Sequence, residues 1–168
     1  MQVYYFKEKF FKITDHYPVL DQDGNEAYFI DQDFKFIGFK VKIKNLATGE
    51  TILVEQKVLN LLPTYEVRFE DGSVMYVKAK IALLGRKVDA TYEGDVLKLK
   101  GNIWDFSFDV YKDRKLIGSL DKKILSFTDQ YVLRVEDENY ADLLIALTIC
   151  INNIKDRARA NNNANANN

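Results

Sequence analysis

Apolar and polar residues alternate along most of the first 136 residues of the chain. The two-residue period is clearest in residues 39–44, 65–70 and 97–100, where apolar side chains alternate with lysine, arginine or glutamate. A period of two is typical of a β-strand with one buried and one solvent-exposed face. The pattern therefore predicts a protein built mainly of antiparallel strands.

Turn signals separate these alternating segments. Asp23-Gly24, Thr48-Gly49, Asp71-Gly72 and Glu93-Gly94 each lie between two of them, and Asp113-Arg114 occupies the equivalent place in a fifth gap. A residue followed by glycine between alternating runs indicates a hairpin, because tight hairpin turns require positive φ angles. About twelve strands are predicted, near residues 3–11, 17–21, 26–34, 37–45, 50–58, 64–70, 74–82, 86–92, 96–103, 105–112, 115–124 and 130–136.

A weak internal repeat supports this division. Three nine-residue segments begin with lysine, end with tyrosine and share their apolar positions: Lys9-Phe-Phe-Lys-Ile-Thr-Asp-His-Tyr17, Lys57-Val-Leu-Asn-Leu-Leu-Pro-Thr-Tyr65 and Lys123-Ile-Leu-Ser-Phe-Thr-Asp-Gln-Tyr131. Looser copies begin at residues 33, 80 and 102, so that the six copies follow one another at a spacing of about 21 to 24 residues. The repeat predicts six strand–corner–strand units joined by the five turns.

A different pattern appears near the C-terminus, where residues 141–151 are apolar at almost every position. A helix that is apolar all round must be enclosed. This run is roughly 16 Å long, whereas a bilayer core is about 30 Å thick, so protein and not lipid should surround it. We therefore predict a closed, roughly twelve-stranded antiparallel barrel over residues 1–155, wrapped around a central helix at 140–154. Residues 156–168, rich in asparagine and alanine, are predicted to be a disordered tail.

The composition of the chain bears on its partners and on its location in the cell. The 168 residues contain 24 Lys and Arg against 25 Asp and Glu, so nothing favours nucleic-acid binding. Cys150 is the single cysteine, so no disulfide within the chain is possible. Charges interrupt the first nine residues where a signal peptide would be apolar. We expect a cytoplasmic protein without a transmembrane segment.

Several of these segments resemble the LURP-one-related family of the tubby C-terminal-like superfamily. The resemblance is carried by Leu62-Pro63-Thr-Tyr65, Gly101-Asn-Ile-Trp104-Asp-Phe, Ser126-Phe-Thr-Asp-Gln-Tyr131 and the apolar helix, and it covers nearly all of residues 1–155. It implies a twelve-stranded barrel around a C-terminal helix. Relatives in the superfamily include the phosphoinositide-binding tubby domains and the phospholipid scramblases. A role at lipids is thus implied by analogy alone, and residues 135–139 do not match the scramblase calcium-binding segment.

Residues that could perform chemistry are few. His16 follows Asp15, as in a carboxylate–histidine general base, but neighbouring strand residues face opposite ways and no nucleophile is identifiable. Cys150 lies within the apolar helix and is expected to be inert in the core. Asp137, Glu138 and Asp142 could bind calcium, yet helix capping explains the same carboxylates. We predict no catalytic residue, metal or cofactor.

Lysines form the remaining candidate site. Lys40, Lys42 and Lys44 make an outward stripe on one strand, and Lys78 and Lys80 repeat the pattern on another. Clustered lysines bind anionic membranes at about 1 kcal/mol each. The alternative is an ordinary solvated face, and glutamates on an intervening strand would interrupt a continuous patch.

The expectation for function is therefore a non-catalytic binding module. It would engage anionic phospholipid headgroups or a protein partner through its outer surface, with Lys40, Lys42, Lys44, Lys78 and Lys80 as candidate contacts. The alternative is a carrier or sensor of a small apolar ligand inside the barrel, but a helix in the lumen leaves little room for one.

Overall fold

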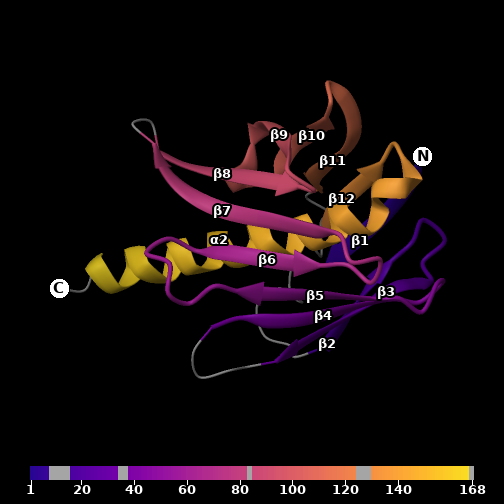
Figure 1. Ribbon diagram of the computed structural model, residues 1–168, viewed down its shortest axis with the longest axis horizontal. Coiled ribbons are helices and arrows are strands. Elements are labelled where there is room, and N and C mark those ends of the chain that lie inside the picture. The colour runs from indigo at the N-terminus through magenta and orange to yellow at the C-terminus, as the bar shows by residue number, and fades with distance from the viewer. Residues whose placement is uncertain (8–15, 34–37, 83–84, 124–129, 167–168) are drawn as a thin grey trace.

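The computed structural model describes residues 1–7, 16–33, 38–82, 85–123 and 130–166 (Figure 1). Within these residues the structure has twelve strands, two short 3₁₀ helices and one long α-helix. The strands are β1 (Gln2–Lys7), β2 (His16–Leu20), β3 (Glu26–Asp33), β4 (Lys40–Asn45), β5 (Thr51–Gln56), β6 (Thr64–Arg68), β7 (Val74–Ala82), β8 (Gly85–Tyr92), β9 (Asp95–Asn102), β10 (Ser107–Lys112), β11 (Lys115–Lys123) and β12 (Gln130–Val135). The helices are η1 (Ile103–Asp105), η2 (Glu138–Tyr140) and α2 (Ala141–Ala166).

The strands form one closed antiparallel barrel in which each strand pairs with its neighbours in the chain. The barrel closes where β1 pairs with β12, with a register that runs from Gln2 opposite Val135 to Lys7 opposite Gln130. Closure leaves the sheet without an open edge. The prediction of a twelve-stranded barrel is confirmed.

The two ends of the barrel differ in their connections. We call the end with the hairpin turns at residues 21–25, 46–50, 69–73, 93–94 and 113–114 the turn end, and the opposite end the corner end. At the turn end, Gly94 has a φ of +85°, as the X-Gly signals predict. Where the fifth turn lacks glycine, Asp113 and Arg114 adopt positive φ themselves.

The described corners are residues 57–63 and 103–106, where η1 ends in the left-handed residue Phe106. The other predicted corners fall on residues 8–15, 34–37, 83–84 and 124–129, which lie outside the described residues.

Helix α2 fills the barrel. Figure 1 shows it running along the inside of the strands, from the turn end to beyond the strand ends at the corner end. Leu144, Ile145, Leu147 and Cys150 are all at most 1 % exposed, although they point in different directions around the helix. Inward side chains of every strand surround them, so the core consists of one helix enclosed by one sheet.

A glycine lets the helix approach the wall. A Cβ added at Gly118 of β11 would lie 2.6 Å from Leu144 Cδ1 and 2.7 Å from the carbonyl oxygen of Arg134. Any larger residue would therefore meet both the helix and the neighbouring strand β12.

The helix is longer than the sequence pattern predicts. It begins at Ala141, directly after η2, and continues to Ala166, so residues 156–166 have a helical backbone and not that of the expected disordered tail. The physical reason lies in the sequence, because arginine and alanine favour helices and no glycine or proline follows Ile154 to end the helix. None of the described helices is both long enough and apolar enough to cross a membrane.

Candidate functional site

The lysines of β4 point outward, as their alternation predicts. Val41 and Ile43 are buried in the barrel, while Lys42 and Lys44 are exposed on its outer surface. Lys40 is less exposed, because its ammonium lies 3.0 Å from the carboxylate of Glu55 on β5. The stripe therefore presents two unpaired ammonium groups within the described part of the chain, and one that is already neutralised.

Ion pairs continue from β4 across β5 and β6. Arg68 lies 3.2 Å from Glu55 and also pairs with Glu66. Lys57 reaches the other oxygen of Glu66 at 2.6 Å. The hydrogen bond from Lys57, followed by the effect of Arg68, holds the pKa of the Glu66 carboxyl below its usual range. Carboxylates thus occupy the surface directly beside the lysine stripe.

The lysines of β7 are separated from that stripe. Lys78 is exposed, and Lys80 pairs with Asp89 on β8. Because β5 and β6 lie between β4 and β7, the five predicted lysines form two groups with the acidic pairs between them. Anion binding by these lysines remains a prediction, which now concerns two separate groups of lysines and not one continuous patch.

His16 has a carboxylate partner on the neighbouring strand, and Asp15 lies outside the described residues. The Nδ1 of His16 is 2.9 Å from Oδ1 of Asp31, directly across on β3, and its ring stacks on Phe29 at 6.0 Å. The pair lies on the outer face of the barrel with both side chains substantially exposed. Neither contact brings a nucleophilic side chain to the imidazole.

The three carboxylates near the start of α2 make separate contacts. Asp137 accepts a hydrogen bond from the backbone N–H of Asn139 and lies 2.6 Å from Lys115, which lowers the pKa of its carboxyl. Asp142 accepts hydrogen bonds from Tyr28 and Asn45 instead. The capping role expected for this group is therefore observed at Asp137. No cluster of three metal-ligating side chains occurs among the described residues.

The thiol of Cys150 lies in the centre of the core. It is fully buried, and this burial raises its pKa far above the usual range for a thiol. The expectation of an inert core cysteine agrees with this position.

A depression of about 690 Å³ opens at the turn end of the barrel, where α2 begins. Its walls include Asp21, Glu26, Glu50, Glu138 and Asp142, together with Tyr4 and Tyr28. Because several carboxylates line the depression, it repels anions. It is therefore poorly suited to phospholipid headgroups, and the helix below it closes the way into the barrel.

The corner at residues 57–63 carries a feature that the sequence analysis missed. Leu59 and Leu61 are 96 % and 103 % exposed, and Val58 beside them is also exposed. The repeat places these residues at a corner but does not say whether a corner side chain points inward. The available signal was the run Val58-Leu-Asn-Leu-Leu62, which lacks the alternation of a strand and the polarity of a loop.

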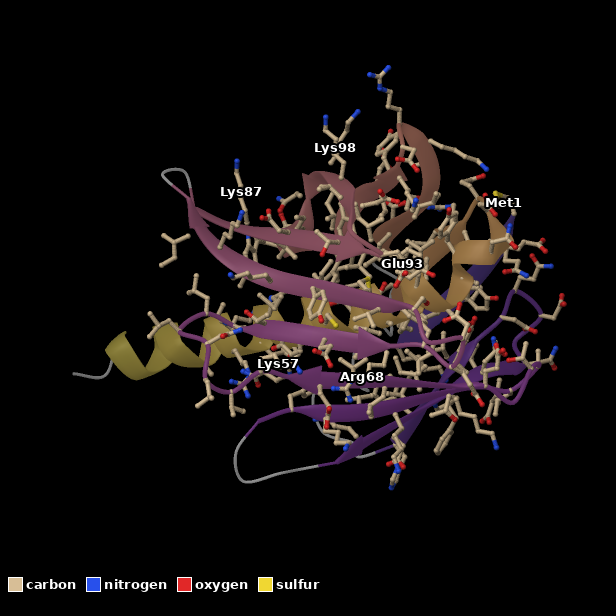
Figure 2. All side chains as sticks on the ribbon, in the orientation of Figure 1. Met1, Lys57, Arg68, Lys87, Glu93 and Lys98 are labelled. Atoms are coloured by element: carbon tan, nitrogen blue, oxygen red, sulfur yellow. The ribbon has the colours of Figure 1, made fainter. Side chains whose placement is uncertain are left out.

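Charge is unevenly distributed along the barrel axis. Around the turn end, the cations Lys44, Arg68, Lys112, Arg114 and Lys115 are outnumbered by carboxylates: Asp21, Asp23, Glu26, Glu50, Glu70, Asp71, Glu93, Asp95, Asp113, Glu136, Asp137, Glu138 and Asp142. Toward the corner end, the carboxylates Asp31, Glu55, Glu66, Asp89, Asp105, Asp121 and Asp156 lie among a slightly larger number of cations: Lys57, Lys78, Lys80, Lys87, Lys122, Lys123, Lys155, Arg157 and Arg159. Figure 2 shows Lys57 and Lys87 toward the end where α2 leaves the barrel, and Glu93 and Met1 toward the other. The near-zero net charge therefore hides an excess of carboxylates at the turn end.

Comparisons with known proteins agree with the architecture. A family model described as LURP-one-related matches residues 2–152. The chain is similar to the uncharacterized protein YxjI of Bacillus subtilis (strain 168), with 26 % identity over 147 residues that cover 88 % of each chain. It also shares its fold with an Arabidopsis thaliana protein of known X-ray structure, with a TM-score of 0.58, 13 % identity and coverage of 90 % of this chain and 91 % of that one. The chain therefore belongs to the LURP-one-related family.

Proposed function

We propose that this protein is a non-catalytic binding module that engages anionic phospholipid headgroups through its outer surface. The observation that supports the proposal is the uneven distribution of charge along the barrel, with an excess of carboxylates at the turn end and exposed lysines, among them Lys78 and Lys87, toward the corner end. A molecule with this polarity is oriented in the field of an anionic surface even though its net charge is −1.

Exposed cations supply the affinity in this proposal. Lys78 and Lys87 lack an ion-pair partner among the described residues, whereas Lys80 can exchange Asp89 for a phosphate. Each lysine close to an anionic leaflet contributes about 1 kcal/mol at physiological ionic strength. The cytoplasmic leaflet carries the anionic lipids, so the proposal places the protein in the cytoplasm.

The two other functional classes have less support. For an enzyme, the described contacts of His16 are an exposed contact with the Asp31 carboxylate and a stack on Phe29, neither of which supplies a nucleophile. For a carrier of an apolar ligand, the lumen along α2 is already occupied by side chains such as Leu147 and Ile151.

The test is co-sedimentation with vesicles of phosphatidylcholine alone, of phosphatidylcholine with phosphatidylserine, and of phosphatidylcholine with a phosphoinositide, each at low and moderate salt. We expect binding to the two anionic mixtures only, with affinity that falls as salt rises. The triple variant Lys78→Ala/Lys80→Ala/Lys87→Ala should bind about tenfold more weakly or worse.

A charge-matched control is available at the opposite end. Lys112→Ala/Arg114→Ala/Lys115→Ala removes the same number of cations from the turn end and should leave vesicle binding unchanged. Lys40→Ala/Lys42→Ala/Lys44→Ala measures the contribution of the β4 stripe. If the wild-type protein sediments with no vesicle at any salt concentration, the proposal is wrong and a protein partner becomes the leading alternative.

A further inference from the structure

The corner between β5 and β6 is held in place by main-chain hydrogen bonds. The N–H of Lys57 donates to the carbonyl oxygen of Thr64 at 2.8 Å, and the N–H of Asn60 donates to that of Lys57 at 3.3 Å. A third bond, from Ala79 N–H to Pro63 O at 2.9 Å, fastens the corner to β7. These bonds give the segment a defined shape.

The corner also makes a packing contact on its other side. Val58 packs against Gly38, two residues before β4, where an added Cβ would come within 2.9 Å of Val58 Cγ1. With its base fixed on both sides, the corner projects two leucines, Leu59 and Leu61, fully into solvent. Ile81 on the adjoining strand β7 is 78 % exposed. The apolar surface is therefore a projecting tip.

Cations surround this apolar tip. Lys57 at its base is paired with Glu66, and Lys78 and Lys80 lie on the outer face of β7 next to it, where Lys80 is paired with Asp89. Lys87 lies directly across from Lys80 on β8. Figure 2 shows Lys57 and Lys87 on either side of β6 and β7, near the end of the barrel from which α2 emerges.

We propose that the corner end is the face that docks on the membrane, with Leu59 and Leu61 inserted at the boundary between headgroups and acyl chains. The lysines around the tip would then contact lipid phosphates, while the acidic turn end points away from the bilayer. This inference rests on the proposed function and adds to it the orientation of the protein and the residues that enter the lipid.

The chemistry of the tip favours lipid over a protein partner. Protein interfaces are enriched in aromatic side chains and arginine and depleted in lysine, and their anchors fill complementary pockets. Here the projecting side chains, Leu59 and Leu61, are aliphatic, and the charged residues beside them include several lysines. That combination matches surfaces that insert shallowly into anionic membranes.

Two double variants separate the inference from the proposed function. Leu59→Ser/Leu61→Ser removes the apolar tip, and Leu46→Ser/Val96→Ser removes two exposed apolar side chains from the turn end. Both are measured by co-sedimentation with vesicles of phosphatidylcholine and phosphatidylserine. We expect the tip variant to bind about tenfold more weakly or worse, and the control to bind as the wild type does. Unchanged thermal melts would show that both variants fold.

A fluorescent label tests insertion directly. Because Cys150 is fully buried, a thiol-reactive, environment-sensitive dye labels Leu61→Cys selectively, and Val96→Cys provides the control at the other end. Mixing with anionic vesicles should shift the emission of the Leu61→Cys dye to the blue and leave that of the Val96→Cys dye unchanged.

The outcomes are distinct. Wild-type binding together with an unaffected tip variant and an unshifted dye would overturn the orientation but leave the proposed function standing. Absence of wild-type binding would overturn both. A tip variant that converts a wild-type dimer into a monomer, without altering vesicle binding, would instead assign the leucines to contact between copies of the chain.

Discussion

The phenol of Tyr28 donates a 2.6 Å hydrogen bond to Oδ1 of Asp142, across 114 positions of sequence. It joins β3 to the first turn of α2 at the turn end, and Asn45 Nδ2 donates to the same oxygen at 2.9 Å. The corner end has a counterpart, where the phenol of Tyr65 donates to Asn153 Oδ1 at 2.6 Å. Two tyrosines on opposite ends of the barrel thereby fix the position of the helix along its axis and its rotation.

Removing the first of these hydroxyl groups should loosen the helix. We expect Tyr28→Phe to lower the free energy of unfolding by about 1–3 kcal/mol, because a hydrogen bond to a carboxylate is lost inside the protein. Chemical denaturation measures the change, and a double-mutant cycle with Asp142→Asn isolates the pair. Tyr76→Phe on the outer face of β7 is the control and should be nearly neutral. A cycle with zero coupling would contradict the role given to Tyr28.

The contact between Gly118 and Leu144 provides a steric test of the packing. Gly118→Ala should destabilise the protein by about 1–3 kcal/mol, because the added methyl group must displace the helix or β12. Ser119→Ala, at the next residue of the same strand, faces the other way and should cost much less. The measurement is the midpoint of cooperative urea unfolding. Equal effects of the two substitutions would show that α2 does not press on β11 at this point.

Lys155 gives the protein a distinctive dependence on pH. It is 7 % exposed at the corner end, with its ammonium 4.0 Å from the centre of the Phe106 ring. Burial, reinforced by Arg159 and opposed by Asp105, lowers its pKa from 10.5 to about 8. Between these two pKa values the unfolded chain binds more protons at this site. The contribution of Lys155 to the free energy of unfolding therefore rises with pH through this window, and below pH 8 the charged amine is a cost.

Replacing the amine should relieve that cost. We expect Lys155→Met to raise the free energy of unfolding at pH 7 by about 1–2 kcal/mol, after allowance for the lost contact with Phe106. The gain should shrink steadily as the pH rises from 8 toward 10. Urea unfolding at intervals up to pH 9.5 avoids the range in which tyrosines of the unfolded chain ionise. The exposed Lys42→Met should show no such trend, and a pH-independent gain for Lys155→Met would contradict the lowered pKa.

The buried thiol reports on opening of the barrel. Because Cys150 is enclosed and its pKa is raised, a thiol reagent should react about a thousandfold or more slowly with the native protein than with the protein in guanidinium. The native rate should rise in Tyr28→Phe and Gly118→Ala, in proportion to their loss of stability. Rapid reaction of the native wild-type protein would place the cysteine outside a closed core.

Most of the fold could be predicted from the sequence because two periods dominate it. Alternation locates the strands, and the all-round apolar run at 141–151 can be satisfied only by enclosure. The end of α2 was harder to predict, because Arg157 and Arg159 are compatible with both a helix and a solvated tail.

The candidate binding surface could not be predicted in full, because it depends on strand register and on the shape of a corner, which the sequence pattern does not reveal. The outward direction of Lys42 follows from alternation, but the pairing of Lys40 with Glu55 and of Lys80 with Asp89 depends on strand register. The exposure of Leu59 and Leu61 depends on the shape of a corner, where no period determines side-chain direction.

The pairing of β1 with β12 constrains how the protein can be made. During synthesis the first strand leaves the ribosome early and must wait, without its closing partner, until the twelfth has emerged. The helix that forms the centre of the core comes later still, so the twelve strands keep their apolar faces uncovered until it emerges. Until α2 is in place, these exposed apolar faces make the nascent chain prone to aggregation. A chain that terminates before Ala141 would have all the strands of the barrel but not the helix that fills it.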